Sequence, residues 1–101
     1  MSIKEEITYK GISLNIDKEL DYVEFIAKGD IDEYIESLNL LVEYLSYVSH
    51  LYVIVNKRDF KTKKWDGFLQ DYEKGIYNQL KSVGVQKILC VNGNFDLISA
   101  I

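Results

Sequence analysis

The apolar run Leu51–Val55 limits the possible folds of this chain more than any other stretch. Its sequence, LYVIV, does not alternate between apolar and polar residues and is rich in β-branched side chains. Strands of this kind are usually parallel, central in a sheet and covered on both faces. The run therefore predicts an α/β domain in which helices pack on a mixed, mostly parallel sheet.

A basic segment and an amphipathic helix are predicted after this strand. The segment Lys57–Lys64 is rich in lysine and arginine and is expected to be a loop. Apolar residues then recur at helical intervals, at Trp65, Leu69, Tyr72, Ile76, Leu80 and Val83. Thr62 is the expected N-cap of this helix, and Gly84 is expected just past its end. Gly75 inside the helix costs about 1 kcal/mol relative to alanine, which leaves room for close packing there.

An antiparallel hairpin is predicted near the start of the chain. Apolar and polar residues alternate over residues 12–16, as in a half-buried strand. A second strand is expected over Leu20–Lys28, and the short connection makes the pair antiparallel. Ile7 and Tyr9 leave two options open, because they either extend the first strand or form a separate short one.

The remaining elements complete the predicted order β-β-α-β-α-β-(α). A helix is expected over about Asp32–Val48, with Asp30 as its cap. A buried strand is expected over Val85–Val91, followed by a short final helix over Phe95–Ile101. Each strand–helix–strand unit should be a right-handed crossover onto the sheet, with the first hairpin as its antiparallel edge.

Composition narrows the class of protein. A chain of 101 residues is expected to form one domain, and its hydrophobic content of 48% is ordinary for a globular protein. A single cysteine, Cys90, fits a reducing compartment. The first residues lack the apolar core of a signal peptide, and the longest apolar runs of about five residues are too short to span a bilayer. We therefore expect a soluble cytoplasmic protein.

Charge is unevenly distributed along the chain. The net charge of −4 argues against non-specific binding of nucleic acid. Between Lys28 and Lys57 there is no lysine or arginine, but there are five carboxylates, at Asp30, Asp32, Glu33, Glu36 and Glu43. The next stretch is the basic one, so an acidic segment is followed directly by a segment that could dock an acidic partner.

Three stretches of this sequence resemble the STAS domain, which is named for sulfate transporters and anti-sigma factor antagonists. Gly29–Asp32 (GDID) is similar to the family's entry from a strand into its first helix, and Val53–Asn56 to an apolar strand that ends in aspartate in the family. Gly67–Leu69 is similar to the start of its second helix. The resemblance covers roughly residues 12–101 and implies a STAS-like fold with a regulatory, protein-binding role of the bacterial type.

The chain departs from the STAS pattern at the position of the family's regulatory switch. The resemblance places Trp65 where the family has a phosphorylatable serine, and Lys64 where it has the preceding aspartate. Asn56 replaces an aspartate at the end of the strand. A serine phospho-switch is therefore not expected here, and the nearest hydroxyl, of Thr62, is interpreted as a helix cap. Ending at Ile101, the domain is expected to be either minimal or short of a last helix.

The candidate binding residues gather around the basic segment. They are Asn56, Arg58, Phe60, Lys61, Thr62, Lys63, Lys64 and Trp65. We expect them to dock a protein with an acidic surface. We do not expect them to bind a small anion, because charges on a solvated loop are the simpler interpretation there. Trp65 is either an exposed anchor of the interface or part of the core. A homodimer stays open as an alternative, and nucleic acid is not the expected partner.

No catalytic, metal or cofactor site is expected. His50 follows a predicted helix end and is interpreted as a capping residue, and Cys90 as a small buried hydrophobe. A metal site would need further ligands. The leading hypothesis is a non-catalytic STAS-like interaction module. The alternative is a small apolar or anionic ligand in a pocket at the strand ends, beside Asn56, Trp65 and Tyr72.

Overall fold

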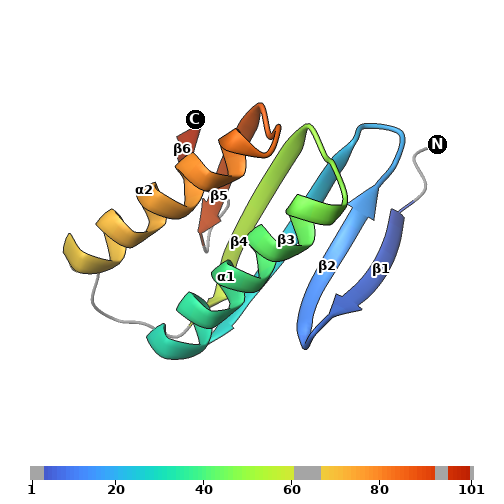
Figure 1. Cartoon of the computed structure of the whole chain (residues 1–101). Helices are drawn as coiled ribbons and strands as arrows, with labels where there is room; N and C mark the ends of the chain where they lie inside the picture. The colour runs from blue at the N-terminus through green and yellow to red at the C-terminus, as the bar shows by residue number, and fades with distance from the viewer. Residues whose placement is uncertain (1–3, 61–66, 93–95, 101) are drawn as a thin grey trace.

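The computed structural model describes residues 4–60, 67–92 and 96–100. It is a small α/β domain with one mixed sheet and two helices (Figure 1). The elements, in order, are β1 (Lys4–Tyr9), β2 (Ile12–Asp17), β3 (Tyr22–Gly29), α1 (Ile31–Tyr47), β4 (Tyr52–Phe60), α2 (Gly67–Ser82), β5 (Lys87–Asn92) and β6 (Asp96–Ala100).

The strands lie in the sheet in the same order as in the chain. β3, β4 and β5 are parallel to one another, and the pairs β1–β2, β2–β3 and β5–β6 are antiparallel. Because both helical crossovers join neighbouring parallel strands with the same hand, α1 and α2 lie on one face of the sheet, as Figure 1 shows. No helix among the described residues is long and apolar enough to cross a membrane.

The start of the chain forms a separate strand, which settles the alternative that the sequence left open. β1 pairs with β2 from Lys4 opposite Asp17 to Tyr9 opposite Ile12. The two residues between them, Lys10 and Gly11, both have positive φ angles, of 47° and 92°. That backbone is typical of the tight turn that best matches the twist of a two-stranded hairpin.

Two predictions about the sheet are wrong. Residues Asp96–Ala100 form a strand against β5 and not a helix, because a helix this short is marginal whereas strand pairing satisfies the backbone groups along β5. The second wrong prediction is that the strand of the apolar run, β4, is covered by helices on both faces. Val53 and Val55 are buried under the helices, whereas Tyr52 is exposed and Ile54 half-buried beside its neighbours on the other face.

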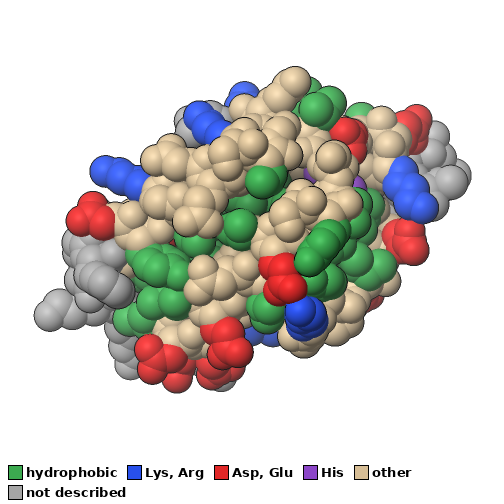
Figure 2. All heavy atoms as spheres, in the orientation of Figure 1, with side chains coloured by type: hydrophobic (Ala, Val, Ile, Leu, Met, Phe, Trp, Pro, Cys, Tyr) green, Lys and Arg blue, Asp and Glu red, His purple; other side chains and the backbone are tan. Residues whose placement is uncertain are grey.

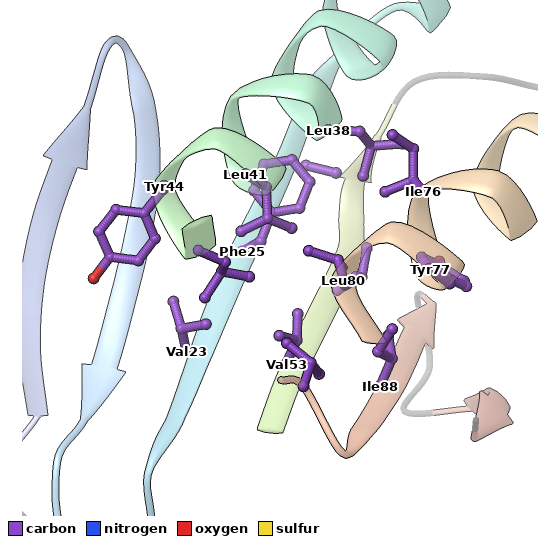
Figure 3. Close-up of a cluster of buried hydrophobic side chains, with 14 of the residues drawn as sticks. Val23, Phe25, Leu38, Leu41, Tyr44, Val53, Ile76, Tyr77, Leu80 and Ile88 are labelled. Carbon is purple, nitrogen blue, oxygen red and sulfur yellow. The ribbon is translucent and has the colours of Figure 1, made fainter. Parts of the chain in front are cut away.

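The core lies between the sheet and the two helices. Leu38 and Leu41 of α1 and Leu80 of α2 are fully buried against Phe25 and Val53 of the sheet (Figure 3). The interval pattern of three and four residues in each helix explains this, because it aligns apolar side chains on one face. The helices thus bury one face of the sheet, and no helix of the described residues lies over the other face.

Two of the local sequence signals at the helix ends, at Asp30 and Gly84, are confirmed. Asp30 caps α1, since its carboxylate accepts a hydrogen bond of 3.0 Å from the backbone N–H of Glu33. At the end of α2, Gly84 has a φ of +106°. The N–H groups of Gly84 and Val85 return to the carbonyls of Lys81 and Leu80, each at 3.1 Å, which is the Schellman arrangement. The predicted cap Thr62 lies outside the described residues.

Two glycine-to-alanine substitutions are expected to change stability in opposite directions. Gly29 has a φ of +82°, and a Cβ there would lie 2.5 Å from the Glu33 carboxyl group, so Gly29→Ala should cost about 1–2 kcal/mol. Gly75 is exposed in α2, and a Cβ there would meet no described atom within 4 Å. The prediction of close packing at Gly75 is therefore wrong. Gly75→Ala should stabilise the fold by about 0.5–1 kcal/mol, because alanine has the higher helix propensity. Urea denaturation of both variants measures the difference, and equal shifts would contradict it.

Candidate functional site

A bulge near the end of β4 shapes the candidate site. The pairing of β3 with β4 shifts between Ile26, which is opposite Asn56, and Lys28, which is opposite Asp59. Two residues of β4, Lys57 and Arg58, therefore occupy the space of one residue of β3. The Asn56 side-chain oxygen accepts a hydrogen bond of 3.0 Å from the Arg58 N–H, so the bulge does not leave that donor unsatisfied.

Lys57 turns into the core and forms a buried ion pair with α2. Its Nζ lies 2.6 Å from Glu73 Oε2, and the two side chains are only 4% and 6% exposed. The prediction that Lys57 belongs to a solvated loop is wrong, because β4 continues through it to Phe60. Lys57 follows Val53 and Val55 at alternate positions, and this places it on the face that the helices cover.

Two tyrosines and the cysteine complete the buried cluster around Glu73. The hydroxyls of Tyr34 and Tyr77 both donate to Glu73 Oε2, the latter at 3.2 Å. Tyr77 Oη also lies 2.7 Å from Cys90 Sγ. Because Tyr77 gives its only proton to Glu73, the thiol is the donor in this last contact. Lys57 Nζ lies 5.7 Å from the centre of the Tyr34 ring, so the ring face also meets the positive charge.

Burial sets the protonation state of both phenols. It raises the pKa of Tyr34 far above its ordinary value, and the negative charge of Glu73 and the hydrogen bond to it add to this effect. Burial likewise raises the pKa of Tyr77, with further contributions from Tyr34, Cys90 and Glu73. Both groups therefore stay protonated at neutral pH and remain donors to the carboxylate.

This cluster, which we call the buried cluster, joins four elements: α1 through Tyr34, β4 through Lys57, α2 through Glu73 and Tyr77, and β5 through Cys90. None of its side chains is more than slightly exposed. Its contacts therefore link the two helices to the parallel strands β4 and β5 inside the core. It fixes the end of β4 relative to α2, the two elements that flank residues 61–66.

The structure places some of the predicted binding residues together. Asn56 is half-buried on the face away from the helices, where its Nδ2 donates to Glu24 Oε2 at 3.0 Å. Arg58 is exposed, and Phe60 ends β4 opposite Gly29. Asn56 and Arg58 are linked by the hydrogen bond at the bulge. The other predicted binding residues, Lys61, Thr62, Lys63, Lys64 and Trp65, lie outside the described residues.

The residues of the alternative ligand pocket do not converge. Asn56 lies on the open face of the sheet, whereas Tyr72 lies on the helical side and donates to Asn39 Oδ1 of α1 at 2.9 Å. The sheet separates the two side chains, so they do not line one pocket. Trp65, the third residue predicted there, is outside the described residues.

His50 and Cys90 lie in separate environments. The His50 ring stacks on Tyr44 with 6.0 Å between ring centres, and its Nε2 lies 3.4 Å from the Tyr44 hydroxyl. Its Nδ1 lies 3.3 Å from Asp21 Oδ1 without hydrogen-bond geometry. Cys90 contacts Tyr77 instead. Across the described parts of the chain, no group of three His, Cys, Asp or Glu residues is placed to hold a metal ion.

The buried cluster was missed at the level of sequence, although two signals for it were present. Glu73 lies four residues after Leu69 and three before Ile76, so it interrupts the apolar face of its own helix with a charge. Lys57 continues the alternation of Val53 and Val55. A cation and an anion that both occupy inward positions predict a buried pair, because either charge alone would be costly in the core.

Comparison with known proteins gives no relative. The chain matches no protein-family model, no curated protein and no solved structure. The resemblance to STAS domains therefore stays a prediction, made from the three sequence stretches at Gly29–Asp32, Val53–Asn56 and Gly67–Leu69.

Proposed function

We propose that this protein is a non-catalytic, STAS-like regulatory module that binds an acidic protein partner through the segment Arg58–Trp65 and the start of α2. The observation that supports this most directly is the buried cluster. Its Lys57–Glu73 pair joins the two elements from which the segment departs and to which it returns. Binding segments held on a rigid scaffold lose less conformational entropy when a partner binds.

Charge around the segment supports an oriented interface. Arg58 is exposed at the end of β4, where Phe60 pairs with Gly29 just before the start of α1. The first two turns of α1 expose the carboxylates of Asp32, Glu33 and Glu36. Figure 2 shows acidic side chains gathered at the lower left, the side on which α1 begins in Figure 1. An acidic partner would be attracted to the basic segment and repelled by these carboxylates, which restricts how it can dock.

The environments of the reactive side chains support a role without catalysis. Catalytic groups must come within hydrogen-bond distance of a substrate. The lysine, glutamate and cysteine of the buried cluster are closed off from solvent, and His50 packs against Tyr44 at the other end of β4. The proposal therefore assigns these groups to folding stability and assigns function to the surface.

Reversing the charge of the segment tests this proposal. The variant Lys61→Glu, Lys63→Glu, Lys64→Glu is expected to weaken capture of an acidic protein from lysate at least about tenfold, because like charges would meet at the interface. Captured proteins are identified by mass spectrometry, and folding is checked by circular dichroism.

The matched control has the same change in net charge on other surfaces. Lys10, Lys18 and Lys74 are exposed, and their reversal to glutamate should leave capture within about threefold of the wild type, because distant surface charges are screened by salt. Equal loss in both variants would show that capture reports net charge alone and would reject the segment as the binding surface.

A further inference from the structure

The large hydrophobic side chains that are exposed among the described residues gather at one end of the domain. We call this surface the apolar end; it consists of Leu20, Tyr47, Val48, Leu51 and Tyr52. Tyr47 is 77% exposed and Leu20 58% exposed. They come from the β2–β3 turn, the last residues of α1 and the start of β4, along the upper edge of the sheet in Figure 1. Arg58 lies at the opposite end of β4.

Hydrogen bonds show that these segments are neighbours. The Asp21 carbonyl accepts from the Tyr52 N–H at 3.2 Å, and its carboxylate accepts from the Leu51 N–H at 3.2 Å. On the other side, the Leu51 carbonyl accepts from the Gln86 N–H at 2.8 Å. The β2–β3 turn, the start of β4 and the start of β5 therefore lie side by side, with the apolar residues of β4 in the middle.

Charges of opposite sign lie on the two sides of this apolar centre. The β2–β3 turn carries Glu19 and Asp21, and Lys18 on the same turn is already paired with Glu5 at 3.2 Å. The α1 helix also ends here with no basic residue in its last turn, so its dipole adds negative potential.

The basic side of the apolar end comes from α2 and β5. Lys81 lies in the last turn of α2, and Lys87 begins β5 opposite Tyr52. Both side chains are exposed. Since neighbouring strands are about 4.8 Å apart, the acidic turn before β3 and the basic start of β5 are separated by about 10 Å.

We propose that the apolar end binds a second copy of this chain in a two-fold symmetric dimer. A two-fold axis through the centre at Leu51 places the acidic side of one copy on the basic side of the other, and it stacks the apolar centres. The surface is thus complementary to itself in both charge and hydrophobicity. A uniformly basic partner would be repelled by Lys81 and Lys87, and a uniformly acidic one by Glu19 and Asp21.

This dimer adds a second surface to the module without using the first. Because Leu51 directly precedes β4 and Arg58 lies near the other end of that strand, the two Arg58 ends of the dimer point away from each other. On the proposed function, such a dimer presents two docking segments to acidic partners, which raises the apparent affinity for a divalent target.

Sedimentation velocity of the whole chain over a concentration series tests the dimer. The wild type is expected to dimerise below about 1 mM, and Leu51→Ser should weaken the dimer at least about tenfold by removing apolar area at its centre. Lys74→Glu, on an exposed position of α2 away from the end, is the matched charge control and should leave the dimer unchanged. Circular dichroism confirms that each variant folds.

A charge-exchange experiment identifies the partner as a second copy. In the proposed dimer, Glu19→Lys places a lysine opposite Lys87 of the other copy, and Lys87→Glu places a glutamate opposite its Glu19, so each variant alone should dimerise more weakly than the wild type. Mixed in equal amounts, the two should form a heterodimer, because the introduced lysine then faces the introduced glutamate and Lys87 faces Glu19.

Two results would overturn the dimer. A wild type that stays monomeric at about 1 mM would mean that some other molecule covers the apolar end. A dimer that survives both Leu51→Ser and Lys87→Glu would mean that the chain self-associates through a different face. Neither result bears on capture of an acidic protein by the Arg58–Trp65 segment, so this proposal and the proposed function can fail separately.

Discussion

Lys57→Met is expected to lower the free energy of unfolding by about 3–5 kcal/mol, because it leaves the carboxylate of Glu73 buried without its counter-charge. Methionine fills nearly the same volume as lysine, so no large cavity forms and the loss of packing contributes little to this change. Urea denaturation with a two-state fit measures the change.

A second substitution separates loss of charge from loss of packing. In the double variant Lys57→Met, Glu73→Gln, the amide oxygen still accepts from Tyr34 and Tyr77, but no buried charge remains. The double variant should therefore be more stable than Lys57→Met alone by at least about 2 kcal/mol. A cost below about 1 kcal/mol for Lys57→Met would contradict a buried ion pair.

Alkaline pH is expected to unfold the protein steeply. Burial raises the pKa of Tyr34 and of Tyr77 far above the value of about 10 in the unfolded chain. Above pH of about 10, the unfolded state therefore releases two protons that the folded state keeps. Stability is fully present below that pH and falls above it by about 1.4 kcal/mol per pH unit for each tyrosine, or about 2.7 for both.

Denaturation measured at several values from about pH 9 to pH 11 gives this slope. Tyr34→Phe should reduce it by about 1.4 kcal/mol per pH unit, because one of the two phenols of the buried cluster is gone. Tyr47→Phe is the control, since this side chain is 77% exposed and its substitution should leave the slope unchanged. A Tyr34→Phe slope equal to that of the wild type would place the alkaline loss elsewhere in the protein.

Features decided by neighbouring residues could be predicted from the sequence. Asp30 caps α1 and Gly84 ends α2 through contacts within three to five residues, and both were correctly predicted. The mixed sheet and its parallel centre also followed from the apolar run before Asn56. Burial of Cys90 was predicted as well, from the apolar strand around it.

Features decided by distant residues could not be predicted in the same way. The burial of Lys57 depends on its ion pair with Glu73 of α2 and on the bulge in the pairing of β3 with β4. The strand Asp96–Ala100 depends on backbone groups that β5 offers. Of the candidate binding residues, only Asn56, Arg58 and Phe60 can be placed, and a contact with a partner depends on a second molecule that one sequence does not encode.

The affinity of the captured acidic protein for the wild type and for the Lys61→Glu, Lys63→Glu, Lys64→Glu variant tests the proposed function most directly. Isothermal titration calorimetry at a fixed, physiological salt concentration gives both values. We expect a loss of at least about tenfold in this variant and little change in the Lys10→Glu, Lys18→Glu, Lys74→Glu control. Equal affinities for the wild type and the first variant would contradict it.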